Sequence, residues 1–191
     1  MTIMASKGDA LVPLEIWFLN VGHGDCTIIK FPTGRIAMVD INNAPALDDE
    51  SEKEIALSVG GLTEAQYALY KALGNRIQAV KDYEKLLVNP VEFWQTHFTG
   101  ETIFRFLVTH PDMDHLSGLY RLVAQERVPI LNFWDTHNHK KMTTDDFSDG
   151  PYDYRDWEQY QTLRNSRTSP RVLRLHRCDE GNYWTDDGVT I

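Results

Sequence analysis

A short run in the middle of the chain constrains the fold most: Phe106-Leu-Val-Thr-His-Pro-Asp-Met-Asp-His115. Its apolar, β-prone beginning predicts a strand, and Pro111 ends that strand because proline has no N–H to donate to a sheet. Four side chains that can bind a metal ion follow on the loop at the strand's end: His110, Asp112, Asp114 and His115. Imidazole nitrogen and carboxylate oxygen together suit zinc, manganese or iron.

The residues after this loop predict a helix. Apolar side chains recur at positions 116, 119, 122 and 123 within 116–128, which is the spacing of one helix face. The two aspartates would then lie at the positive end of the helix, which favours carboxylates. Carboxylates this close repel each other unless a cation or hydrogen bonds compensate. A simpler interpretation is a solvated turn in which Asp114 caps the helix.

The net charge of −9 argues against a broad nucleic-acid-binding face, which needs clustered Lys and Arg. Contact with phosphate at a single site is still compatible with this charge, because a bound metal ion reverses the local field. The simplest interpretation of the one basic patch is a solvated strand edge kept from aggregating by charge. The patch consists of Arg164, Arg167, Arg171, Arg174 and Arg177.

The chain of 191 residues is long enough for one domain with a hydrophobic core. Its longest apolar runs are far shorter than a membrane span, and the first fifteen residues lack the apolar stretch of a secretory signal. Cys26 and Cys178 do not make a disulfide framework. We therefore expect reduced cysteines, a cytoplasmic protein and no membrane contact.

The remaining elements follow from hydrophobic spacing and turn residues. We expect three antiparallel strands at 14–19, 26–31 and 35–41, the last two joined by a turn at 32–34. We expect one or two helices between 62 and 87 with a break at 74–75, and a short helix at 91–98. A strand at 128–134, a polar loop at 136–151, a helix at 152–165 and a strand at 171–176 complete the pattern.

Three segments, in this order, resemble the metallo-β-lactamase superfamily. Phe18-Leu-Asn-Val-Gly-His-Gly-Asp25 looks like the opening "DVGQGD" segment of the branch typified by the hydrolase-like domain of ComEC/Rec2 competence proteins. Met38-Val-Asp-Ile-Asn-Asn43 looks like the "LIDGG" strand end of that branch. Thr109-His-Pro-Asp-Met-Asp-His-Leu-Ser-Gly118 looks like its "THPDADHIGG" loop and is the most specific of the three.

The resemblance implies a site with two divalent metal ions, zinc or alternatively manganese or iron. His110 and Asp112 would bind one ion, and His115 would bind the second together with Asp114, which is also the candidate catalytic residue. Asp112 stands where the wider superfamily commonly has histidine, and this extra carboxylate suits harder cations such as manganese.

Residues of the first two segments would surround these ligands. Asp40 would orient them by hydrogen bonding, or would only form the turn at a strand end. His23 would contact substrate or make a local hydrogen bond, and Asp25 is a further candidate for contact with ligands or substrate. Asn42 and Asn43 replace the glycines of the branch, which leaves the backbone geometry after Asp40 open.

The implied fold belongs to the α/β class as an αββα sandwich. We expect residues 1–191 to be the N-terminal portion of one such domain, an incomplete sandwich with a helical insertion at about 43–100. The second half of the family's domain supplies further ligands, so we expect this chain alone to bind metal weakly and to be a poor or inactive catalyst. His137 and His139 could bind metal but fit a lid or surface loop better, and His97 and His176 are expected to be incidental or exposed.

The implied function is metal-dependent hydrolysis of a phosphodiester in a nucleotide or nucleic acid. The alternatives are hydrolysis of a small-molecule ester, lactone or thioester, and a non-catalytic interaction module with an incomplete metal site. The sequence contains no phosphate-cradling P-loop and no nucleophile paired with a base in a recognisable motif. The oligomeric state is left open.

Overall fold

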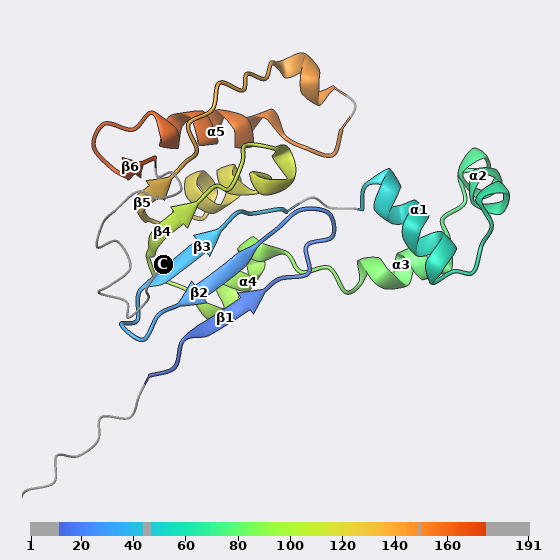
Figure 1. The fold of residues 1–191 in the computed structure, drawn as a ribbon, viewed down its shortest axis with the longest axis horizontal. Coiled ribbons are helices and arrows are strands. Elements are labelled where there is room, and N and C mark those ends of the chain that lie inside the picture. The colour runs from blue at the N-terminus through green and yellow to red at the C-terminus, as the bar shows by residue number, and fades with distance from the viewer. Residues whose placement is uncertain (1–11, 44–46, 149, 175–191) are drawn as a thin grey trace, which may run out of the picture.

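The computed structural model describes residues 12–43, 47–148 and 150–174, which form a mixed α/β fold around a six-stranded sheet (Figure 1). The strands follow one another in the sheet in chain order. They are β1 (Glu15–Phe18), β2 (Thr27–Lys30), β3 (Ile36–Val39), β4 (Ile103–Leu107), β5 (Ile130–Trp134) and β6 (Arg171–Leu173). The α/β class expected from the sequence is thus confirmed.

The first three strands pair antiparallel, as expected, and β3 to β6 pair parallel. This change of direction determines which loops meet. The carboxyl ends of β3, β4 and β5 share one edge of the sheet, and Thr27 at the start of β2 pairs with Val39 at the end of β3. The loop between β1 and β2 therefore lies at this same edge, where ligands bind in open parallel sheets.

Three helices between β3 and β4 form a lobe at one end of the molecule (Figure 1). This helical lobe has its own small core, made of Ile55, Ala56, Tyr67, Ile77 and Val80. The break between α2 and α3 was expected from the sequence, whereas α1 was not. The lobe consists of α1 (Asp49–Ser58), α2 (Glu64–Ala72) and α3 (Gln78–Glu84).

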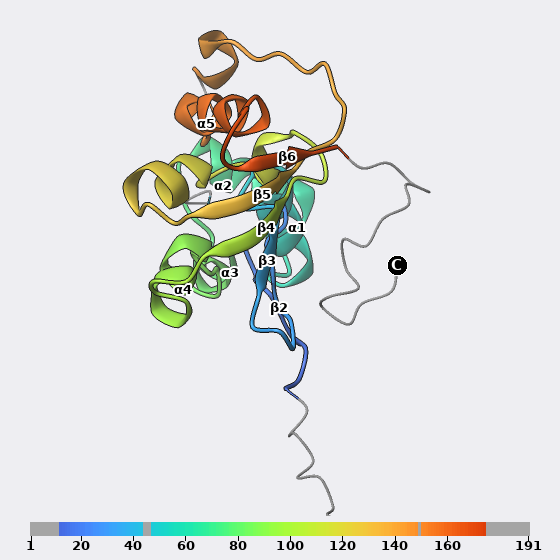
Figure 2. The same cartoon turned by 90° about the vertical axis from the view of Figure 1, so that its left-hand side faces the viewer.

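The main core lies on one face of the sheet, which α4 (Pro90–His97) and α5 (Tyr154–Arg164) cover (Figure 2). The helix expected at 152–165 is present as α5, which turns Trp157, Tyr160 and Leu163 into the core. Although α4 falls within the expected insertion, it packs here, through Trp94. Within the described part of the chain, no helix combines the length and apolar character needed to cross a membrane.

The helix expected at 116–128 is shorter and less regular than the spacing suggested. A 3₁₀ turn spans Met113–His115, and a π-helix spans Arg121–Gln125. Gly118 lies between them with a φ of 97°, a left-handed conformation that interrupts a regular helix. The prediction of an apolar face is confirmed, because Leu116, Leu119 and Leu122 are fully buried.

The capping role considered for Asp114 is wrong. Asp156 on α5 accepts a hydrogen bond from the backbone N–H of Tyr120 at 2.8 Å and another from that of Gly118. A carboxylate from a different element thus satisfies the free N–H groups at the start of this helical segment. Burial raises the pKa of Asp156 above its ordinary value, and the two backbone hydrogen bonds oppose that rise.

Candidate metal centre

The three motif segments meet at the sheet edge described above. The backbone N–H of Ile41 donates to His115, and that of Asn43 donates to Ser117. The side-chain amide of Asn42 donates to the backbone oxygens of Val21 and His23. Segments far apart in the sequence are therefore joined by direct hydrogen bonds around the His110–His115 loop.

Asp40 is buried at the centre of this junction and accepts three hydrogen bonds. The backbone N–H of Thr109 donates to its Oδ1 at 2.8 Å, and the Thr109 hydroxyl donates to its Oδ2 at 2.5 Å. Nδ1 of His115 lies 2.9 Å from the same Oδ2. Asp40 also has a φ of 54°, an uncommon left-handed conformation that aspartate tolerates better than most residues.

These contacts fix the orientation of both histidines of the loop. Because Asp40 accepts, we assign the proton of His115 to Nδ1. The hydroxyl of Thr109 is already donating to Asp40, so it accepts from Nδ1 of His110, 3.1 Å away. Both imidazoles are thus held through Nδ1, one directly and one through a hydroxyl, and both have Nε2 left to accept or to bind a metal ion.

Each Nε2 faces a carboxylate oxygen of the loop. Nε2 of His115 lies 3.3 Å from Oδ2 of Asp114, and Nε2 of His110 lies 3.6 Å from Oδ2 of Asp112. With the tautomers assigned above, acceptor faces acceptor in both pairs. Two ligand atoms bonded at about 2.05 Å to one tetrahedral zinc ion stand roughly 3.3 Å apart. The donor set and its spacing therefore fit a divalent cation at each pair.

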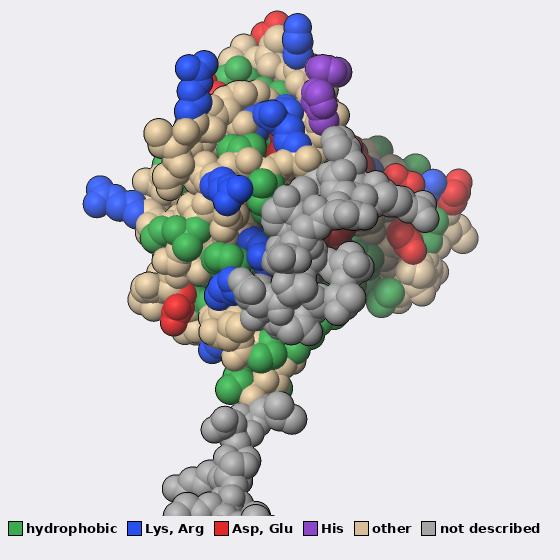
Figure 3. All heavy atoms as spheres, turned by 60° about the vertical axis from the view of Figure 1, so that its left-hand side comes forward, with side chains coloured by type: hydrophobic (Ala, Val, Ile, Leu, Met, Phe, Trp, Pro, Cys, Tyr) green, Lys and Arg blue, Asp and Glu red, His purple; other side chains and the backbone are tan. Residues whose placement is uncertain are grey.

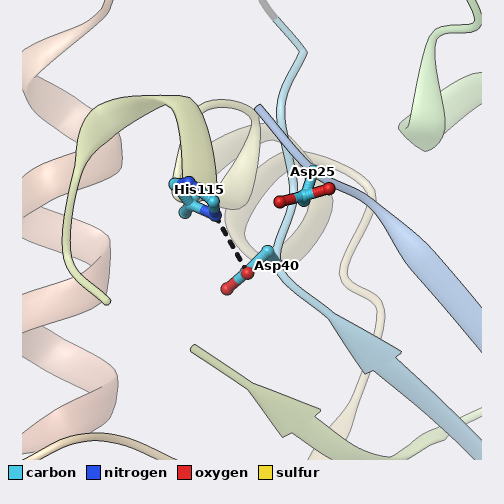
Figure 4. Close-up of side chains that lie close together, drawn as sticks. All are labelled: Asp25, Asp40 and His115. Atoms are coloured by element: carbon cyan, nitrogen blue, oxygen red, sulfur yellow. Dashed lines mark hydrogen bonds and ion pairs between the residues drawn. The ribbon is translucent and has the colours of Figure 1, made fainter. Parts of the chain in front are cut away.

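Two further side chains of the first segment surround the loop. His23 is exposed, with Nε2 3.4 Å from Asp114 Oδ2 and Nδ1 3.5 Å from Oδ2 of Asp48. Asp25, Asp40 and His115 each offer one ligand atom within 4.8 Å of the others (Figure 4). Because both oxygens of Asp40 are already hydrogen-bonded, we interpret Asp40 as a residue that orients His115, and not as a ligand.

A close backbone approach holds the first segment against the loop. Gly24 has a φ of 98°, and a Cβ at this position would overlap the backbone oxygen of Asp114. Gly118 makes a similar approach to Asn43, where a Cβ would stand 2.6 Å from the Cβ of the asparagine. Glycine at these two positions lets three loops pack around one site.

Three residues near the site were not expected from the sequence. Lys140, on the loop after β5, has its Nζ 2.5 Å from Oδ1 of Asp112 and holds the pKa of that carboxyl below its ordinary value. Burial, with the negative charges of Asp114 and Asp48 second, raises the pKa of Tyr152 to about 12. No sequence signal pointed to Lys140, because its place depends on the pairing of β4 with β5.

Asp48 is the third of these residues, and it is the N-cap of α1. Partial burial acts to raise its pKa, but hydrogen bonds from Ser51 and the charge of His23 lower it overall. Through His23 it connects the helical lobe with the His110–His115 loop. Its position directly before an acidic segment was the signal that could have identified it as a helix cap.

Other candidates stand apart from the site. His137 and His139 are exposed and contact each other edge to face with ring centroids 5.3 Å apart, and among the described residues no hydrogen bond or ion pair joins them to the loop. His97 is exposed on α4 and packs on Phe93. Burial, reinforced by Asp40 and Asp25, raises the pKa of the Cys26 thiol, so Cys26 is protonated and is not a nucleophile.

The basic patch needs one correction. Arg164 is buried, and its Nε lies 2.9 Å from Oδ2 of Asp135, so it belongs to the interior and not to a charged strand edge. Arg167, Arg171 and Arg174 are exposed, and Figure 3 shows Lys and Arg side chains dispersed over this face. The predictions made for His176, Arg177 and Cys178 fall outside the described residues.

The sequence matches no protein-family model, and no curated protein matches it.

Proposed function

We propose that this protein is a metal-dependent hydrolase of the metallo-β-lactamase superfamily, in the ComEC/Rec2-like branch, and that it cleaves phosphodiester bonds. Its metal ligands are His110, Asp112, Asp114 and His115. Two divalent ions, zinc or alternatively manganese or iron, are the proposed cofactors. The proposed architecture is the αββα fold of that superfamily, with the helical lobe as an insertion between β3 and β4.

One observation supports this proposal above the others. Asp40 holds both imidazoles through their Nδ1 atoms, one of them through the Thr109 hydroxyl, so that each Nε2 faces an aspartate oxygen. A solvated turn would not need a buried carboxylate with three hydrogen bonds behind it. Carboxylate–histidine–metal arrangements of this kind orient ligands in known metal sites.

The metal ions, Asp114 and Asp40 have different roles in the proposed reaction. Bound divalent ions would lower the pKa of a water molecule and stabilise negative charge that develops on the substrate. Asp114, with its Oδ2 between His115 and His23, is placed to orient that water by accepting a hydrogen bond. Asp40 keeps the imidazoles in the tautomer that binds metal. The phosphodiester substrate is inferred from the resemblance alone, which makes substrate class the first matter to test.

The test measures metal content by plasma mass spectrometry and hydrolysis of bis(p-nitrophenyl) phosphate on the same samples. In buffer supplemented with Mn²⁺ or Zn²⁺, the wild type is expected to bind divalent metal weakly and to hydrolyse the diester slowly. His110→Ala and Asp114→Ala are expected to lose both while their circular dichroism is unchanged. His97→Ala removes an exposed histidine from α4 and serves as the matched control. A p-nitrophenyl acetate assay, run in parallel, distinguishes an esterase. A wild type without bound metal in metal-supplemented buffer would contradict the proposal.

A further inference from the structure

The carboxylates of the proposed site repel the anionic substrate that we propose for it. Asp25, Asp112 and Asp114 gather around it, with Asp48 close to His23. A phosphodiester is itself an anion, so these carboxylates oppose its approach wherever bound cations do not fully offset them. A cationic side chain at the rim of the site would reduce that opposition.

Lys140 has the required charge and position. Among the described residues, it is the one Lys or Arg whose ion pair reaches a carboxylate of the His110–His115 loop. Its side chain is 34% exposed and that of Asp112 is 52% exposed. Exposed pairs of this kind contribute little to stability, so the ammonium can exchange Asp112 for another anion.

A buried polar network fixes the backbone of the loop that bears Lys140. Asp135, at the end of β5, accepts from the hydroxyl of Tyr160 at 2.6 Å and pairs with Arg164 at 2.9 Å. The guanidinium of Arg164 donates to the side-chain and backbone oxygens of Asn138. Asn138 then accepts from the backbone N–H of Lys140 at 3.2 Å.

This network fixes the backbone of Lys140 beside the loop and leaves its side chain movable. The ammonium sits on a flexible four-carbon stem with three donors, unlike the rigid fork of arginine. The neighbouring Lys141 is exposed and forms no ion pair with a described residue. Two adjacent lysines therefore differ in their relation to the site, which supplies a matched control within the chain.

We propose that Lys140 is the anion-binding residue of this site: its ammonium pairs with Asp112 when no metal is bound, and with a phosphoryl oxygen of the substrate once Asp112 binds metal. This inference rests on the proposed function and specifies it, because it assigns the site to substrates that carry a phosphoryl anion. The same ammonium competes with metal for Asp112, so its removal strengthens metal binding and weakens binding of the anion.

Isothermal titration tests both effects in the wild type, Lys140→Gln, Lys140→Arg and Lys141→Gln. The first titrant is Mn²⁺, and the second is inorganic phosphate added to the Mn²⁺-saturated protein. Lys140→Gln is expected to bind Mn²⁺ a few-fold more tightly and phosphate roughly tenfold more weakly, the loss typical of one charge-assisted hydrogen bond. Lys140→Arg is expected to recover part of the phosphate affinity, and Lys141→Gln to match the wild type.

The outcomes separate this inference from the proposed function. Unchanged phosphate affinity in a Lys140→Gln protein that still binds Mn²⁺ overturns the inference alone. An equal loss in Lys141→Gln also overturns it, because the effect would then be one of net charge. A wild type that binds no Mn²⁺ overturns the proposed function, and the inference with it.

Discussion

The two ligand pairs of the proposed metal site differ in how firmly the fold holds them. The side chain of His115 is 7% exposed and hydrogen-bonds to Asp40, which is 2% exposed. The side chains of His110 and Asp112 are 48% and 52% exposed, and their aspartate contacts Lys140 at the surface. The pair of His115 and Asp114, at 7% and 17% exposed, is thus largely inside the protein, whereas the pair of His110 and Asp112 is open to solvent.

This difference in burial predicts that the His115 side of the site is more rigid than the His110–Asp112 side. A buried histidine that is hydrogen-bonded to a buried carboxylate is oriented before a ligand arrives, so ligand binding does not have to order it. An exposed pair can adjust to a metal ion and to the molecule on which the ion acts. We expect substitutions on the buried side to alter folding and metal binding together, and substitutions on the exposed side to alter metal binding alone.

The largest effect expected from this comparison is that of Asp40→Ala. The change leaves the N–H of Thr109 and Nδ1 of His115 without their acceptor, so we expect a loss of about 3 kcal/mol in the free energy of unfolding. Asp112→Ala is expected to change it by less than about 1 kcal/mol, since its ion pair is exposed. Urea unfolding and Mn²⁺ titration of both variants measure the contrast.

If Asp40→Ala does not fold, Asp40→Asn replaces it in this test, because asparagine tolerates the φ of 54° and keeps an acceptor oxygen. The variant is expected to fold and to bind Mn²⁺ 10–100-fold more weakly, the usual effect of altering a residue that orients a metal ligand. Equal stability losses for the Asp40 and Asp112 variants would contradict the distinction between a buried and an exposed side.

A smaller effect is expected from Gly24→Ala, which tests the backbone approach to Asp114. Its Cβ would overlap the backbone oxygen of Asp114, and its φ is positive. We expect a loss of about 2–3 kcal/mol in the free energy of unfolding, and weaker Mn²⁺ binding because the loop is displaced. Gly34→Ala is the control: it has a φ of 83° with nothing within 4 Å, and should lose about 1 kcal/mol. Similar losses at the two glycines would refute the close approach.

The smallest effect concerns Tyr152, whose pKa of about 12 exceeds the ordinary value of 10.0. The folded state therefore retains this proton more firmly, and the resulting stabilisation is complete below pH 10.0 and lost as the pH rises toward about 12. At about pH 11, folded Tyr152→Phe should match the wild type in phenolate absorbance at 295 nm, while in denaturant it should absorb less. Lower absorbance of the folded variant would show that Tyr152 is not shielded.

Much of the fold could be predicted from local pattern. The apolar run before Pro111 and the alternating strands at the start of the chain are strong short-range signals, and the break near Gly74 was apparent from composition. The α1 helix was missed because its segment is acidic and contributes only Ile55 and Ala56 to a buried cluster. Its local signals are the Asp48 cap and an acidic first turn, and packing against α2 and α3 adds to them.

The candidate ligands could also be predicted, because all four lie within one short loop. The contact between Lys140 and Asp112 could not, since it depends on the parallel pairing of β4 with β5, which places two distant loops side by side. For the same reason Arg164 was assigned to a surface patch, whereas its partner Asp135 lies at the end of another strand. The helix after the loop was expected to be regular because the spacing of apolar residues does not reveal the left-handed conformation of Gly118.

The arrangement around Asp40 implies cooperativity between the two proposed metal ions. His115 donates to Asp40 directly, and His110 reaches it through the hydroxyl of Thr109, so both imidazoles depend on one carboxylate. An ion bound to His115 would polarise its ring and strengthen its hydrogen bond to Asp40 Oδ2, the oxygen that the Thr109 hydroxyl also donates to, so the contact that holds His110 would change with it. Binding at one pair would then alter the affinity of the other pair, and by thermodynamic reciprocity the second ion would alter the affinity for the first by the same factor.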